Sequence, residues 1–161
     1  MKPSKVNAIS RGIVCFWALW FSIVFASNVC DALMHLGLLP ATWPFASGNF
    51  VAITKVTARY TIPTAVLGGL FLGVILWELV GAVLFWRAVV SMALTCLDRG
   101  ILYAAFGCGL ALMAAFVITD EICIVYDLEA AHLRLLVAML VSLLFVEFVP
   151  DARCDAATGD K

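Results

Sequence analysis

Four long apolar segments constrain the fold of this chain more than any other feature of its sequence. The segments cover residues 12–34, 64–86, 101–119 and 131–149. Each has about the 20 residues that an α-helix needs to cross the hydrocarbon core of a bilayer, and none alternates apolar with polar residues as a transmembrane strand would. Because a helix pairs its backbone groups internally, the segments predict an all-α, antiparallel four-helix transmembrane bundle that forms one domain, residues 1–150.

The composition excludes two broad classes of protein. Of the 161 residues, 65% are hydrophobic and 13% are charged, whereas soluble domains average about 45–50% apolar and about 25% charged residues. A soluble globular domain is therefore excluded. Ten Lys and Arg residues stand against 11 Asp and Glu residues, so the chain lacks the basic excess that nucleic-acid binding requires.

The Lys and Arg residues of the short loops predict the orientation in the membrane. One side receives Lys2, Lys5, Arg11, Arg87, Arg99, Arg153 and Lys161. The other side receives Lys55, Arg59 and Arg134. Because cytoplasmic loops carry an excess of Lys and Arg, we expect both termini in the cytoplasm. Residues 151–161 are expected to form a mobile cytoplasmic tail.

The first apolar segment has two interpretations. It follows three basic residues, as a membrane anchor would. A cleavable signal peptide would instead end near Ala26 and Ser27, which are small enough for a cleavage site. We expect the segment to be retained, because apolar sequence resumes after Asp31 and three more spans follow.

The segment between the first two spans is too long for a simple hairpin and predicts a structure of its own. Over residues 49–60, apolar and basic side chains separate onto opposite faces of a helix. Ser47 and Asn49 offer capping groups for this helix. We expect a short amphipathic helix on the outer membrane surface, with Trp43 and Tyr60 as interfacial anchors.

Small residues recur at spacings of mostly four positions in two of the spans. The second span carries Gly69, Gly73 and Gly81 with Trp77, and the third carries Gly100, Ala104, Gly107, Ala111 and Ala115. Lipid tails are as apolar as Leu, so membrane helices associate where small residues let their backbones approach. We expect these stripes to pack the helices of this chain against one another, and homodimerisation is the alternative.

A polar stripe marks the outer third of the first span. Its members are Ser27, Asn28, Asp31 and His35. Residues predicted at the same depth are Asp120, Glu121, His132 and Arg134. Arg134 is the expected counter-ion of Asp31 or Glu121, because a guanidinium group can bridge two carboxylates. The cluster of Asn28, Asp31, Glu121, His132 and Arg134 is either a structural network that fixes the helix register or a pocket open to the outer face.

Glu78 is the most costly polar residue, because it lies near the middle of the second span. A charged carboxylate at this depth costs about 2.5–3.5 kcal/mol on insertion scales, so we expect Glu78 to be paired or protonated. Arg87 lies about 13 Å farther along the helix axis, too far for a direct pair. Glu78 is either neutral and hydrogen-bonded to a neighbouring helix, or it acts in proton relay or substrate binding.

The histidines and cysteines offer further alternatives. His35 and His132 could together ligate one haem. Glu129-x-x-His132 matches one half of a di-iron site, but the second half is absent from the sequence, so no metal site is expected. The six cysteines include no Cys-x-x-Cys pair. Only Cys30 and Cys123 map to the oxidising side, and they form a candidate disulfide.

Taken together, the polar motifs of the four spans resemble a family of small bacterial integral membrane proteins of unknown function. The motifs are Asn28 with Asp31, Trp77-Glu78, Asp120-Glu121, and the Ala-Ala-His-Leu-Arg stretch of residues 130–134. In that family, a Gly-Glu-Trp motif follows the third span, and this chain differs by having Thr119-Asp120-Glu121-Ile122. The resemblance implies a four-span bundle of similar length in a bacterial inner membrane, and it implies no activity.

The sequence carries no recognised catalytic motif, and we expect a non-catalytic multi-pass membrane protein without a cofactor. Its expected role is that of an accessory or scaffold subunit, with the lipid bilayer, other membrane subunits or a second copy as partners. One alternative is a small transporter or proton-linked carrier that uses Glu78 and the cluster of Asp31, Glu121, His132 and Arg134. Another is a redox protein that binds haem through His35 and His132.

Overall fold

The computed structural model of the chain describes residues 3–94 and 98–148. Within these ranges it contains five α-helices, one 3₁₀ turn and no β-strand. The helices are α1 (Pro3–His35), α2 (Asn49–Thr57), α3 (Thr64–Leu94), α4 (Arg99–Cys123) and α5 (Tyr126–Phe148), and the 3₁₀ turn η1 (Ala58–Tyr60) directly follows α2. The predicted tail, residues 151–161, lies outside the described residues.

Four of the helices, α1, α3, α4 and α5, are long and apolar enough to cross a membrane. The qualifying stretches are Ala8–His35, Thr64–Ala93, Arg99–Cys123 and Tyr126–Phe148. They confirm the predicted all-α fold with four spans. The helix α3 continues past the predicted end at residue 86 to Leu94, because the residues that follow include neither Gly nor Pro to stop it.

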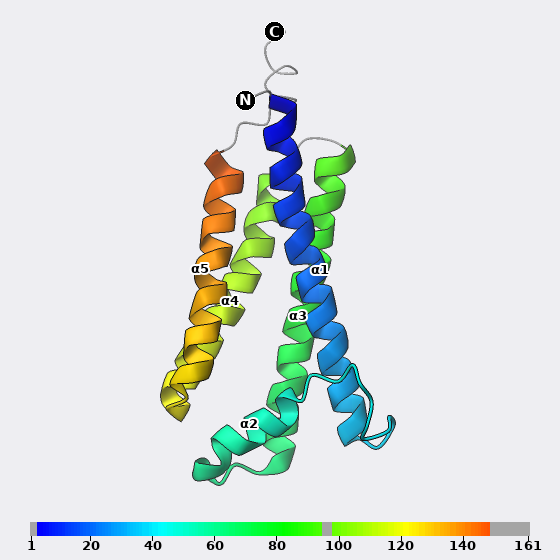
Figure 1. The fold of residues 1–161 in the computed structure, drawn as a ribbon, viewed down its shortest axis with the longest axis vertical. Helices are drawn as coiled ribbons and strands as arrows, with labels where there is room; N and C mark the ends of the chain where they lie inside the picture. Colours follow the sequence, from blue (N-terminus) through cyan, green and yellow to red (C-terminus); the bar gives the residue numbers. More distant parts are fainter. Residues whose placement is uncertain (1–2, 95–97, 149–161) are drawn as a thin grey trace.

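Successive spans run antiparallel, and each packs on the next (Figure 1). The extensive contacts join α1 to α3, α3 to α4, and α4 to α5, whereas α1 and α5 touch only slightly. We call the end of the bundle that carries α2 the α2 end, and the opposite end the far end. The pair α1 and α3 diverges from the pair α4 and α5 toward the α2 end (Figure 1). The first residues of α1 and the last residues of α5 both lie at the far end.

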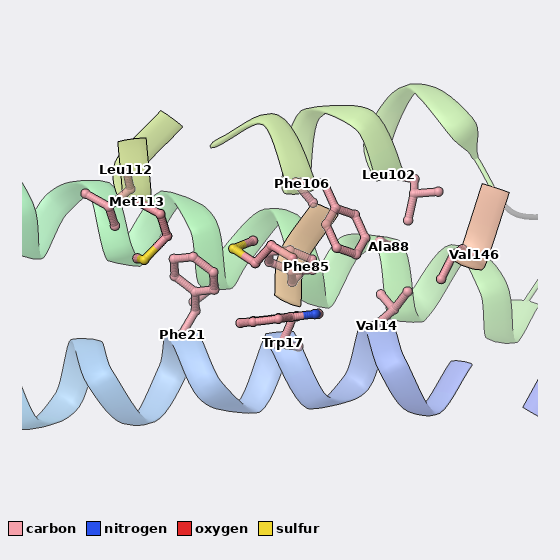
Figure 2. Packing of buried hydrophobic residues seen from close by; sticks show 14 residues of the cluster. Val14, Trp17, Phe21, Phe85, Ala88, Leu102, Phe106, Leu112, Met113 and Val146 are labelled. Carbon is pink, nitrogen blue, oxygen red and sulfur yellow. The ribbon is translucent and has the colours of Figure 1, made fainter. Parts of the chain in front are cut away.

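Aromatic side chains from three helices form the centre of the apolar core (Figure 2). Phe21 of α1 stacks on Phe85 of α3 with 5.4 Å between ring centroids, and Phe85 meets the edge of Phe106 of α4 at 5.0 Å. All three rings are fully buried, and Trp17 of α1 and Met139 of α5 are buried beside them. Because lipid supplies no hydrophobic drive for helix association, the dense van der Waals contacts of these rings hold the spans together.

The hairpin of α4 and α5 is fastened near both of its ends. Near the α2 end, Asp120 of α4 contacts His132 of α5. At the far end, Arg99 of α4 forms an ion pair with Glu147 of α5. Polar contacts between α4 and α5 therefore stabilise the hairpin, in addition to the contact of α4 with α3.

The glycines that allow close helix contact differ from most of those predicted. A Cβ atom at Gly81 would lie 2.8 Å from the Phe21 ring, and one at Gly109 would collide with Met139. At Gly69, Gly73 and Gly107, by contrast, the same position meets open space. The prediction of packing within the chain therefore holds at Gly81 and is wrong for Gly69, Gly73 and Gly107.

The geometry of an α-helix explains this difference. A four-residue step advances about 40° around a helix of 3.6 residues per turn, so three steps from Gly69 to Gly81 turn the stripe by about 120°. The buried face of α3 follows the mixed three- and four-residue spacing of a helix core instead. Its members are Leu67, Phe71, Ile75, Glu78, Ala82, Phe85 and Ala88.

The predicted helix between the first two spans is confirmed, since α2 and η1 together cover Asn49–Tyr60. It lies crosswise to the spans at the end of α3 (Figure 1), and it contacts both α1 and α3. Phe50 packs on Phe71 of α3 with 5.6 Å between ring centroids, and the Tyr60 hydroxyl donates to the carbonyl of Ile122 at the end of α4. The segment of α2 and η1 therefore contacts α3 and α4, and α2 also contacts α1. The interfacial role expected for the exposed Trp43 and Tyr60 stays a prediction.

The variant Gly81→Leu tests the close contact of α1 and α3. We expect it to destabilise the fold by about 1–3 kcal/mol, because the added side chain must displace the buried Phe21 ring. The matched control is Gly107→Leu, whose side chain enters open space. Thermal unfolding of the purified proteins in mild detergent measures both, and equal melting temperatures for the two variants would contradict the packing.

Candidate functional site: a buried polar cluster at the α2 end

Three of the six residues predicted to form a polar network lie close together where α1, α2 and α3 meet. They are Asn28 and Asp31 of α1 and Glu78 of α3, whose exposed fractions are 1%, 1% and 2%. With Ser47 and Asn49, which bond to them from the segment that begins α2, they form what we call the α2-end cluster. The other three predicted residues, Glu121, His132 and Arg134, lie on α4 and α5.

Asn28 holds the carboxylate of Glu78. Its amide nitrogen Nδ2 donates to both Glu78 oxygens, at 2.7 Å to Oε1 and 2.9 Å to Oε2. Within residues 3–94 and 98–148, no basic side chain forms an ion pair with Glu78. The predicted pairing of Glu78 with a neighbouring helix therefore uses a neutral amide as its partner.

The same Asn28 side chain also binds α2. Its carbonyl oxygen Oδ1 accepts a hydrogen bond of 2.8 Å from Nδ2 of Asn49. The Asn28 amide thus donates to α3 through its nitrogen and accepts from α2 through its oxygen. A hydrogen-bonded chain consequently runs from the exposed Asn49 through Asn28 to the buried Glu78.

Asp31 caps the start of α2 from a different helix. Its Oδ2 accepts from the backbone N–H of Phe50 at 2.8 Å and from the Ser47 hydroxyl at 3.1 Å. The N-cap residue of α2 is Gly48, whose left-handed backbone (φ +74°) suits glycine and which has no side chain to cap the helix. Asp31 therefore supplies the acceptor and the negative charge that a helix N-terminus favours.

His35 completes the exposed edge of the cluster. Its Nε2 lies 3.5 Å from Asp31 Oδ1, and its ring centroid lies 4.4 Å from that of Phe50. The backbone N–H of Ser47 also donates to the carbonyl of Ser27, at 3.2 Å. The predicted polar stripe of α1 therefore meets α2 and α3, the elements directly packed on it.

A second polar contact lies on the α4–α5 hairpin. Nδ1 of His132 lies 2.5 Å from Oδ2 of Asp120, and the imidazole packs against the Phe116 ring with centroids 4.8 Å apart. Glu121 is exposed, and Glu129 is a neighbour of like charge. His132 and Asp31 therefore belong to two separate sets of contacts, and the prediction that they share one network is wrong.

Two sequence predictions about pairing are wrong in this structure. Arg134 is exposed on α5 and forms no ion pair with Asp31 or Glu121, because Asp31 is satisfied by α2 and because α5 diverges from α1 at this end (Figure 1). Cys30 and Cys123 are free thiols. They lie on α1 and α4, two helices without extensive contact, and the candidate disulfide does not form.

The two histidines each have separate partners. His35 contacts Asp31 and Phe50 at the end of α1, whereas His132 contacts Asp120 and Phe116 between α4 and α5. Two imidazoles that bind one haem must approach the iron from opposite faces. The arrangement around each ring does not direct it toward the other, so the geometry gives no support to the haem alternative.

The sequence prediction missed the partners of Asp31 and Asn28 on α2. Ser47 and Asn49 are recognisable as capping residues from their types and from their position before an amphipathic stretch. Their side chains, however, point to acceptors on α1. A useful signal was available in Gly48, because a glycine N-cap leaves the helix start in need of an acceptor from elsewhere.

Replacing one partner of the Asn28–Glu78 pair should destabilise the fold more than replacing both. Asn28→Leu leaves the buried Glu78 carboxyl without its donor, and a hydrogen bond to a charged group contributes about 1.5–3 kcal/mol. The double variant Asn28→Leu/Glu78→Leu removes both polar groups from apolar surroundings. We expect it to melt at a higher temperature than Asn28→Leu in mild detergent. Strictly additive losses in the double variant would argue against the pair.

The variant Asp31→Ala should loosen α2 while the spans stay folded. Without the carboxylate, the first turn of α2 loses its cap, which is worth about 1–2 kcal/mol. We expect faster backbone hydrogen exchange over residues 49–57, measured by mass spectrometry. The matched control is Asp127→Ala, an exposed acidic residue in the first turn of α5. Unchanged exchange in α2 of Asp31→Ala would refute the capping role.

Comparison of the chain with protein-family models, with curated proteins and with solved structures finds no match. The resemblance drawn from the short polar motifs therefore stays a prediction.

Proposed function

We propose that this protein is a non-catalytic accessory or scaffold subunit of a membrane assembly. In this proposal it resides in a bacterial inner membrane with both termini in the cytoplasm, as the loop charges predict. The observation that carries the proposal is that the buried polar groups of the α2-end cluster form hydrogen bonds within the protein. Asn28, Asp31 and Glu78 all bond to side chains or backbone groups of their own chain.

The bonding pattern of the α2-end cluster supports a structural role. Each contact joins two different elements: α1 to α3 through Asn28 and Glu78, and α1 to α2 through Asp31 and Phe50. Glu78 and Asn28 have almost no exposed surface, so a solute would have to displace existing hydrogen bonds to reach them. Such a network specifies helix register, which is a known use of buried polar groups.

The outward faces of the spans support a role in assembly. Gly69 and Gly73 of α3 are exposed, and no atom lies near the positions that their side chains would occupy. Large apolar side chains surround them on the same helix. Because small residues let membrane helices approach closely, this face of α3 suits the transmembrane helix of another subunit or of a second copy.

A proton-linked carrier is the second candidate, and one observation favours it. Glu78 is a buried carboxyl in the middle of a span, and an uncharged amide is its hydrogen-bond partner in the described part of the chain. Ionisable groups at this depth frequently mark proton or substrate pathways. The chain of hydrogen bonds to Asn49 gives Glu78 a connection to the exposed surface.

Affinity purification of the tagged full chain in mild detergent separates the two candidates. For a subunit, we expect one membrane protein, or a second copy, to co-purify stoichiometrically with the wild type and with Glu78→Gln. Gly73→Leu should lose it by steric exclusion, while the control Gly107→Leu retains it. Two findings together would instead favour the carrier. The protein would purify without a partner, and vesicles containing it would show proton transport that Glu78→Gln abolishes.

A further inference from the structure

A groove lies between α1 and α3 at the far end of the bundle, away from the α2-end cluster. Its volume is about 320 Å³, near the lower limit of ligand pockets. Arg11, Gly12 and Cys15 of α1 and Val89, Met92 and Ala93 of α3 line it. Apart from Arg11, these residues offer an apolar wall, so the groove combines one cation with a lipid-like surface.

Gly12 leaves open space at the α1 wall of the groove. It is exposed, and no atom lies within 4 Å of the position where its Cβ would be. Any larger residue at position 12 would project from α1 into the open region beside the groove wall. The contact of α1 with α3 is continuous below this point, where Phe21 packs on Gly81 and Phe85.

Arg11 is positioned at the groove by a backbone contact. Its Nη2 donates to the carbonyl oxygen of Met92, near the end of α3. A guanidinium group has five N–H donors, so this bond leaves others available. Among the described residues, no carboxylate forms an ion pair with Arg11. Within the described residues, the groove therefore holds a cation that no carboxylate of the chain pairs with.

The depth of the groove matches that of lipid headgroups. Arg11 lies in the first turn of the candidate span Ala8–His35, and Met92 lies in the last turn of Thr64–Ala93. Because both residues lie at the ends of candidate spans, we place the guanidinium near the membrane boundary, with α1 continuing from it to the depth of the hydrocarbon region. A ligand that fits needs an anionic group at the boundary and an apolar chain below it.

We propose that this groove binds one anionic phospholipid, with its phosphate on Arg11 and an acyl chain beside Gly12, Cys15 and Val89. Arginine recognises phosphate through two parallel N–H donors, which a point charge cannot do. Basic pockets between transmembrane helices bind anionic headgroups on the same grounds. The site is independent of the subunit role proposed above, because it uses neither the α2-end cluster nor the Gly69 and Gly73 face.

Native mass spectrometry of the full chain, in detergent micelles containing equal phosphatidylglycerol and phosphatidylcholine, tests the proposal. We expect the wild type to retain phosphatidylglycerol in preference to phosphatidylcholine. Arg11→Gln should lower this preference about fivefold, the attraction expected of one Arg near an anionic headgroup. Gly12→Leu should lose phosphatidylglycerol while keeping the contact of Arg11 with Met92, so it tests the groove even if Arg11→Gln fails to fold.

The control Gly107→Leu, another exposed glycine with open space around it, should bind phosphatidylglycerol like the wild type. Added inorganic phosphate should leave the lipid bound, because the acyl chain contributes to binding. Equal retention of the two lipids by the wild type would overturn the proposal. So would wild-type binding by Gly12→Leu, or displacement of the lipid by inorganic phosphate alone, which would indicate a bare anion site.

Discussion

A charged or amide side chain is costly inside the hydrocarbon region unless the protein supplies its partner, and this cost organises the α2 end of the bundle. Asn28 supplies that partner for two elements at once, since it donates to Glu78 and accepts from Asn49. Sliding α1 along α3 by one turn would move Asn28 about 5.4 Å and leave the Glu78 carboxyl without a donor. The pair therefore selects one register for the two helices, and α2 is added to that register through the same amide.

The apolar core depends on a different property of the sequence. Lipid competes with side chains for apolar contacts, so what distinguishes the right helix pair is how closely the surfaces fit. Phe21 reaches into the space left by Gly81 and stacks on Phe85, which in turn meets Phe106. The hairpin of α4 and α5 joins this core through α3, and its own ends are fastened by Asp120 with His132 and by Arg99 with Glu147.

The sequence predicted the parts of the fold that follow from local patterns. Four spans follow from apolar length, and the helix at residues 49–60 follows from its two-faced pattern. Which spans are neighbours is not local information, and for this reason the predicted pair of Arg134 and Asp31 is wrong. Opposite charges suggested that pair, yet backbone N–H groups at a helix start serve a carboxylate equally well. Similarly, the four-residue glycine spacing predicts close helix contacts, but residues at this spacing rotate around the helix axis. The spacing therefore does not specify which of the glycines faces a neighbouring helix.

The capping of α2 by Asp31 has a consequence for biogenesis. The acceptor for α2 is synthesised before it, whereas Glu78, which holds Asn28 in position for Asn49, is synthesised after it. A nine-residue helix is too short to be stable alone in water. The helix α2 therefore becomes ordered only after the second span has been inserted. A folded α2 consequently indicates that the first two spans have packed in their native register.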